Sequence, residues 1–355
     1  MNTPPPTSIL DASRRSGTSL PADTLDTAPA ESPRVIRQVL ERADLVFRGI
    51  SRGGGTIVLA IMILVGLFLS IQAVQAVSSV GPIEFLTETQ WSPETNKFGI
   101  AALVSGTVVI ATVALILALP LAIGTSLFIT EVARGAVRRT LTSTIDLMAA
   151  VPSVVFGLWG LAFLQVQIVP LSQWLSQWFG WIPFLKVDGV DPANPLPNDS
   201  LFTSSTFIAG IVVALMIIPI MTSMMTESFS RAPIGEREGA FALGATRWGM
   251  IRTVVLPFGR GGMIGGTMLG LGRALGETIA IYLIISPIFD INFQILQRGS
   301  NSVAAHIALR YGEANEFGTS ALMAAGLALF LLTMVINFTA STVIARSRSG
   351  AESDG

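Results

Sequence analysis

Long apolar runs without a charged residue dominate the chain. An α-helix needs about 20 apolar residues to cross the hydrocarbon core of a bilayer. Five charge-free runs reach this length, and they cover Thr56–Val77, Phe98–Thr130, Leu147–Leu185, Ser200–Thr226 and Phe317–Ala345. A sixth run, Gly261–Ile285, reaches it except for Arg273 and Glu277 near its middle. The pattern predicts an all-α membrane protein with six transmembrane helices, whose membrane domain covers residues 56–345.

The third run is too long for one helix and too short for two helices joined by a turn. Proline removes a backbone hydrogen bond from a helix. Pro170 is followed by Trp174, Trp178 and Trp181, and tryptophan is enriched at membrane interfaces. Two interpretations are open, namely a span that ends near Val169 and is followed by an interfacial segment, or an extra turn buried in the helix bundle.

Composition agrees with a membrane protein and narrows its chemistry. The chain is 51% hydrophobic and 13% charged, whereas soluble domains carry about 25% charged residues. A net charge of −1 gives no general attraction to nucleic acid. The chain has no cysteine and one histidine, His306, which excludes disulfides and cysteine-ligated metals. We expect no metal or cofactor in this chain, and we interpret His306, in the amphipathic stretch 301–311, as a surface residue.

Arginines are concentrated in alternate segments between the runs. Lys97, Lys186, Arg298 and Arg310 lie in one set of segments. The other set, with its flanking tails, carries Arg34, Arg37, Arg42, Arg48, Arg52, Arg134, Arg138, Arg139, Arg231, Arg237, Arg247, Arg252, Arg260, Arg346 and Arg348. Since basic residues favour the cytoplasmic side, both termini are predicted to be cytoplasmic.

The two ends of the chain are predicted to lie outside the membrane domain. Residues 1–32 are rich in Pro, Ser, Thr and Ala, and we expect a disordered cytoplasmic tail. Residues 33–55 form a basic cytoplasmic lead-in that ends in a predicted flexible hinge, Gly53–Gly55. Residues 346–355 form a short cytoplasmic tail.

The segment between the fourth and fifth predicted spans, residues 230–257, carries the local signals of two short helices. Pro233 suits a first helical turn, Gly244 suits a left-handed stop, and Pro257 is expected to end the second helix. Residues Ala240–Leu243 would leave small and apolar side chains exposed on a free loop. The segment therefore predicts a docking surface for another protein.

The same segment resembles the EAA loop of ABC-importer permeases. The similarity lies in Glu238, Gly239, Ala240, Gly244, Val254, Leu256 and Pro257. Gly239 stands where the family usually has Ala, and Val254 where it usually has Ile. The resemblance implies a coupling helix that inserts into a groove of a cytoplasmic ATPase. Its coupling residues would be Glu238, Gly239, Ala240, Gly244, Leu256 and Pro257.

Glycines at four-residue spacing and two opposite charges distinguish the sixth apolar run. Gly262, Gly266 and Gly270 predict a flat helix face that another helix can approach closely. Arg273 and Glu277 are costly inside a bilayer, and such residues usually face a cavity on a substrate path. A guanidinium suits bidentate binding of a tetrahedral oxyanion. Glu277 would orient that guanidinium or accept a hydrogen bond from a protonated phosphate. A structural ion pair between the two residues is the alternative.

Two segments resemble the membrane subunits of phosphate-specific ABC importers. These are Gly270–Thr278 and, in the third run, Ala149–Gly160. The similarity covers about residues 50–345, and Thr278–Ile281 together with Tyr311–Ala314 resembles the PstC-type subunit more than the PstA-type. The resemblance implies a type I ABC-importer permease fold. It also implies a phosphate pathway lined by Arg273, Glu277, Thr278 and Ser153.

The resemblance further implies a set of partners in the bacterial cytoplasmic membrane. These are a PstA-type sibling permease, a dimer of PstB-type ATPases that holds ATP and Mg²⁺, and an extracytoplasmic PstS-type phosphate-binding protein, with the lipid bilayer around them. This chain lacks the GxxxxGK[ST] phosphate loop, which cradles nucleotide phosphates. We therefore expect ATP hydrolysis on the ATPase, and this chain to be a transporter subunit rather than an enzyme.

Three other functions remain open. A permease for sulfate or molybdate would share the coupling loop but need not share Arg273 and Glu277. The chain could also be the PstA-type sibling. An intramembrane hydrolase would use Glu277 as acid or base and Ser286 or Thr278 as nucleophile. It lacks a base at suitable spacing from either hydroxyl and leaves the coupling loop unexplained.

Overall fold

The computed structural model describes residues 42–95, 97–190 and 198–348. The predicted tail 1–32, the first part of the lead-in and residues 349–355 lie outside the described residues. The chain divides into two units after Leu59. The first unit contributes only the start of helix α1 to the described residues, and every contact discussed below lies within the second.

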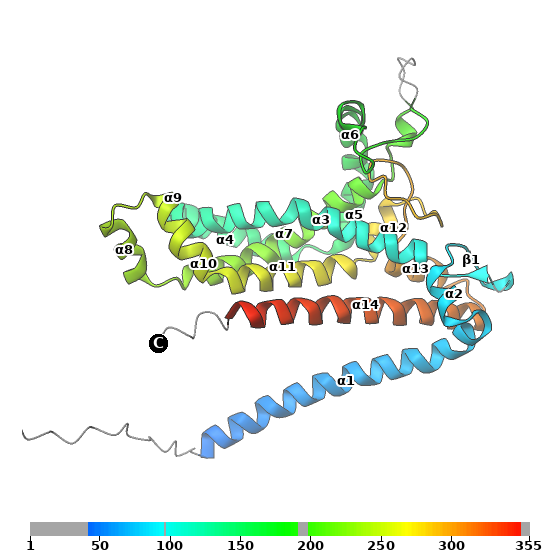
Figure 1. The fold of residues 1–355 in the computed structure, drawn as a ribbon, viewed down its shortest axis with the longest axis horizontal. Coiled ribbons are helices and arrows are strands. Elements are labelled where there is room, and N and C mark those ends of the chain that lie inside the picture. Colours follow the sequence, from blue (N-terminus) through cyan, green and yellow to red (C-terminus); the bar gives the residue numbers. More distant parts are fainter. Residues whose placement is uncertain (1–41, 96, 191–197, 349–355) are drawn as a thin grey trace, which may run out of the picture. The chain divides into compact units, whose positions relative to one another are not determined.

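Five helical segments of the described residues are long and apolar enough to cross a membrane (Figure 1). Three of these segments lie within single helices, namely α1 (Arg42–Val80), α7 (Thr206–Ser230) and α14 (Glu316–Arg348). The other two are composite. One joins α3 (Ala101–Leu127) to the π-turn η2 (Phe128–Val132), and the other joins α5 (Ser153–Trp159), the π-turn η3 (Gly160–Leu164) and α6 (Gln165–Phe179). A sixth candidate is the pair Arg247–Phe258 and Arg260–Leu275, which is bent by 66°. The apolar pattern thus predicted the long helices and the place of the sixth candidate.

The sixth apolar run is not one helix, contrary to the prediction. Helix α11 (Arg260–Leu275) ends at Gly276, and α12 (Ile279–Ile284) begins after Thr278. Glycine is a poor helix former, and the Glu277 carboxylate accepts a hydrogen bond from the backbone N–H of Ala280. These two features favour the end of α11 and the start of a new helix over one continuous helix.

The third run also differs from its prediction. Its first residues belong to α4 (Gly135–Ala150), which ends before Pro152 because a residue that precedes proline avoids the helical conformation. From Ser153 the helix continues through Pro170 to Phe179, so the prediction of a span that ends near Val169 was wrong. Gly53–Gly55, the glycines predicted as a hinge, lie inside α1. The helix runs through them without a break.

Shorter elements connect these helices. A hairpin pairs β1 (Trp91–Ser92) with β2 (Lys97–Phe98), and Trp91 lies opposite Phe98. The remaining elements are α2 (Pro82–Thr87), η1 (Pro93–Thr95), η4 (Asp199–Leu201), α8 (Ile234–Ala242), α9 (Arg247–Met250), the π-turn η5 (Ile251–Val255), α10 (Leu256–Phe258) and α13 (Val303–Arg310).

The main core forms where α3, α7 and α11 lie side by side (Figure 1). Close approach depends on residues without a side chain. A Cβ atom at Gly210 would lie 2.5 Å from Val113, and one at Gly262 would lie 2.1 Å from Ser228. Gly266 and Gly270 also face α7. The predicted flat glycine face is therefore confirmed, and it holds α11 against α7.

Candidate functional site

A polar hollow of about 440 Å³ lies where α11 gives way to α12. It is lined by Ser153, Gly272, Arg273, Gly276, Glu277, Thr278 and Ile279. Ser153 is the first residue of α5, directly after Pro152. The four residues predicted for the substrate pathway, from two distant parts of the chain, therefore surround one hollow. Ser286, the alternative nucleophile, is not part of this lining.

Arg273 and Glu277 have different surroundings in this hollow. Arg273 is exposed and forms no ion pair with any residue that the structure describes. Glu277 is 7% exposed, and its Oε1 accepts the Ala280 N–H at 3.2 Å. The structure therefore contains no ion pair between Arg273 and Glu277, which was the alternative prediction. Among the described residues the Arg273 guanidinium has no carboxylate partner, while the Glu277 carboxylate is held by the Ala280 N–H.

A second hollow, of about 680 Å³, adjoins the first at Gly272 and Arg273. Helices α7, α11 and α14 line it, and Asn337 and Ser341 are its polar contributions from α14. Sequence reasoning missed these two residues because single polar residues in an apolar run carry no motif. The described ranges contain no group of three or more His, Cys, Asp or Glu that could hold a metal ion.

The loop after α7 folds as two short helices around Gly244, as predicted. Gly244 has a φ of +83°, which confirms the left-handed stop. Phe241 is 47% exposed and Leu243 is 92% exposed, and Glu238 and Gly239 are exposed with them. Ala240 differs from the prediction of an exposed surface, because it packs against the main core.

The last two predicted coupling residues lie apart from this turn, in α10. Leu256 packs against the main core, and Pro257 does not end the helix, which extends to Phe258. The π-turn η5 precedes it, and a π-turn shifts the hydrogen-bond spacing so that a missing N–H is tolerated. The bend follows at Gly259, where a Cβ atom would lie 2.3 Å from the Phe229 ring. Sequence reasoning missed Gly259.

An ion pair that sequence reasoning also missed joins α8 to η2. Arg237 Nη1 lies 3.0 Å from Glu131 Oε1, and the side chains are 20% and 5% exposed. Arg237 Nη2 donates to the Phe229 carbonyl at 2.6 Å. The available signal was Glu131 itself, an acidic residue directly after an apolar run.

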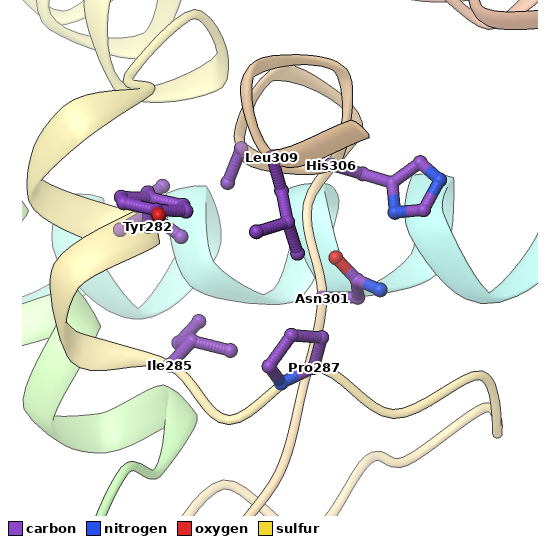
Figure 2. Close-up of a pocket in the computed structure, with 8 residues that line it drawn as sticks. Tyr282, Ile285, Pro287, Asn301, His306 and Leu309 are labelled. Carbon is purple, nitrogen blue, oxygen red and sulfur yellow. The ribbon is translucent and has the colours of Figure 1, made fainter. Parts of the chain in front are cut away.

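His306 is buried, so the prediction of a surface residue was wrong. It is 1% exposed and meets the rings of Trp91 and Phe289 edge to face, with centroids 4.6 Å and 5.5 Å away. It borders a cavity of about 220 Å³ between α12 and α13, which Tyr282 also lines (Figure 2). Burial and, to a lesser extent, the Arg310 charge lower the pKa of His306 to about 4. The amphipathic pattern misled because the β1–β2 hairpin covers this face of α13.

Comparison with known proteins supplies the family. Residues 118–349 match the family described as binding-protein-dependent transport system inner membrane component. Phosphate transport system permease protein PstC 2 of Mycobacterium tuberculosis is 36% identical over 89% of this chain and 97% of its own length. Phosphate transport system permease protein PstC of Haemophilus influenzae is 40% identical over 71% of this chain and 78% of its own length.

A solved structure shows the same fold at low sequence identity. It is the crystal structure of a bacterial ABC transporter involved in the import of the acidic polysaccharide alginate, with a TM-score of 0.54 and 17% identity over 85% of this chain and 98% of that chain. With its several apolar helices, this chain is a multi-pass membrane protein. It belongs to the family of binding-protein-dependent transport system inner membrane components, and within it is similar to PstC permease proteins.

Proposed function

We propose that this chain is the PstC-type permease subunit of an ATP-driven importer of inorganic phosphate. The observation that carries the proposal is the hollow of about 440 Å³ in which Ser153, Arg273, Glu277 and Thr278 meet. Support for the substrate comes from relatives named phosphate transport system permease protein PstC, which are 34% to 40% identical to this chain.

Arg273 is the anion-binding group in this proposal. Its guanidinium has a planar set of donors that matches two oxygens of a tetrahedral oxyanion. The hydroxyl group of Ser153, which lines the same hollow, adds a hydrogen bond to a remaining oxygen. The Thr278 hydroxyl donates to the Gly276 carbonyl at 3.1 Å and would have to turn from it to reach phosphate. Because these groups come from α5, α11 and the α11–α12 connection, relative movement of the helices changes the site.

Glu277 provides a basis for selecting phosphate over sulfate. Its carboxylate accepts hydrogen bonds and donates none when ionised. Phosphate carries a proton near neutral pH and can donate to it, whereas sulfate carries none and meets only repulsion. The hydrogen bond from Ala280 keeps the carboxylate in position for this discrimination.

We further propose six membrane spans with both termini in the cytoplasm of a bacterial cell. The second arm of the bent pair, α11 (Arg260–Leu275), with α12 after it, forms the fifth. The arginines of the loop between α7 and α11 and of the α3–α4 connection support this orientation.

The remaining parts of the transporter would be separate proteins. A PstA-type sibling would complete the pathway, and a PstS-type binding protein would deliver phosphate from outside. A PstB-type ATPase dimer, which holds ATP and Mg²⁺, would dock on the loop that contains Glu238, Gly239, Gly244 and the exposed Leu243. This chain would then convert closure of the ATPases into access to the hollow.

The test is uptake of labelled phosphate by cells that lack this chain, with and without its restoration. We expect restoration to recover uptake, and excess arsenate but not sulfate or molybdate to compete. Competition by sulfate or molybdate would indicate a permease for another oxyanion. Uptake that is indifferent to the chain would overturn the phosphate assignment.

A further inference from the structure

Helix α8 is attached to the rest of the protein through one narrow face. Of its nine residues, only Arg237 and Ala240 are half-buried, and the other seven are exposed. Residues three apart lie on the same side of a helix. Ala240 packs against the main core, and the main neighbours of α8 are α9 and η5, which belong to the same loop. Arg237 provides side-chain polar contacts from α8 to helices outside this loop.

Arg237 reaches two helices that come before α8 in the chain. Its Nη1 lies 3.0 Å from Glu131 Oε1, in the π-turn at the end of α3. Its Nη2 donates to the Phe229 carbonyl near the end of α7 at 2.6 Å. The Glu131 side chain is 5% exposed, and a buried carboxylate depends on its partner for compensation. One guanidinium thus ties α8 to the ends of both α3 and α7.

We propose that the Arg237–Glu131 pair is a positioning device that passes movement of α8 to α3 and α7. Both helices pack against α11, which carries Arg273. A displacement of α8 would therefore reach the hollow through the main core instead of being absorbed by the loop. This inference rests on the proposed function, since it takes an ATPase docked on α8 as the source of the movement.

The test uses the full transporter, with its sibling, ATPases and binding protein, reconstituted in liposomes. The measured quantity is phosphate imported per ATP hydrolysed. We expect Arg237→Ala and Glu131→Gln each to lower this ratio at least about tenfold, because either change leaves a buried charge without its partner. The ATPase should still copurify and hydrolyse ATP. Arg237→Lys, which keeps the positive charge, should import nearly as much phosphate per ATP hydrolysed as the wild type.

The same loop offers a matched control. Arg231 pairs with Glu227 at 2.7 Å, but these side chains are 71% and 65% exposed, and exposed pairs contribute little. Arg231→Ala should therefore leave the ratio unchanged.

Two results would overturn the inference. One is an unchanged ratio in both Arg237→Ala and Glu131→Gln, and the other is loss of assembly in both, which would give the pair a structural role only. A wild-type transporter that imports no phosphate would instead overturn the proposed function, so the two failures are distinguishable.

Discussion

Two neighbouring charges in one apolar run, Arg273 and Glu277, have different surroundings. Glu277 is buried and its carboxylate caps the start of α12, whereas Arg273 is exposed in the hollow. Placing either an arginine or a glutamate inside a bilayer costs free energy. The break at Gly276 separates them, so that Glu277 is held by the backbone of α12 while Arg273 has no ion-pair partner among the described residues.

Arg273→Ala should abolish phosphate transport without loss of assembly. A charge-assisted hydrogen bond contributes about 1.5–3 kcal/mol, so removal of the fork should lower uptake at least about tenfold. The measurement is labelled phosphate uptake together with copurification of the ATPase. Arg52→Ala, at an exposed position of α1, serves as the control. Failure of Arg273→Ala to assemble would indicate a structural role instead.

The free energy of unfolding should fall as the pH falls from about 6.5 to about 4. Above this range His306 is neutral in the folded and the unfolded chain. Within it the unfolded chain, with a pKa near 6.5, binds a proton that the folded chain, with a pKa of about 4, does not. Stability therefore decreases with falling pH, by at most about 3 kcal/mol.

Thermal unfolding in detergent at about pH 7.5 and pH 5 measures this effect. Since the chain has no other histidine, His306→Leu should flatten the dependence in this range. An equal loss of stability in wild type and variant would contradict the assignment.

At the scale of elements, π-turns and a bend mark the places where the loop between α7 and α11 meets the long helices. The turn η2 places Glu131 at the end of α3, and η5 precedes the 66° bend before α11. π-turns are frequent at functional positions. Here η2 carries Glu131, which pairs with Arg237 of α8, and η5 lies in the loop itself.

Gly244→Val should uncouple ATP hydrolysis from transport. A Cβ atom at Gly244 would meet nothing within 4 Å, yet φ is +83°, so the strain is in the backbone alone and costs about 1–2 kcal/mol. ATP hydrolysis and phosphate uptake are measured in the same membranes. Gly235→Ala is the control, since its Cβ also meets nothing within 4 Å, its φ is not in the left-handed range, and it is not one of the predicted coupling residues. Normal coupling in Gly244→Val would show that the left-handed turn is not needed to link ATP hydrolysis to transport.

At the scale of the whole molecule, the proposed topology can be tested because the chain has no cysteine. Leu243 is 92% exposed and is expected on the cytoplasmic side, whereas Ser200, also exposed, is expected outside. A membrane-impermeant thiol reagent should label Ser200→Cys in intact cells. It should label Leu243→Cys only after permeabilisation, and the reverse pattern would contradict the proposed orientation.

Local chemistry along the chain was enough for several features. Charge-free runs predicted the long helices, because a membrane helix needs only length and apolarity. Gly244 predicted a left-handed stop and Gly262, Gly266 and Gly270 a close contact, because both follow from the absence of a side chain. The charges of Arg273 and Glu277 in an apolar run indicated a substrate path, and the resemblance to phosphate-importer subunits added Ser153 and Thr278.

Tertiary structure decided what depends on a partner distant in the chain. The break in the sixth apolar run is the exception, since its partners Glu277 and Ala280 are three residues apart, and apolarity alone gave no sign of it. The burial of His306 depends on Trp91, and the ion pair of Arg237 depends on Glu131, which lies 106 positions away. No local pattern encodes such pairs, because the two groups meet only when distant segments pack together, and the attraction of opposite charges becomes strong only in the water-poor interior.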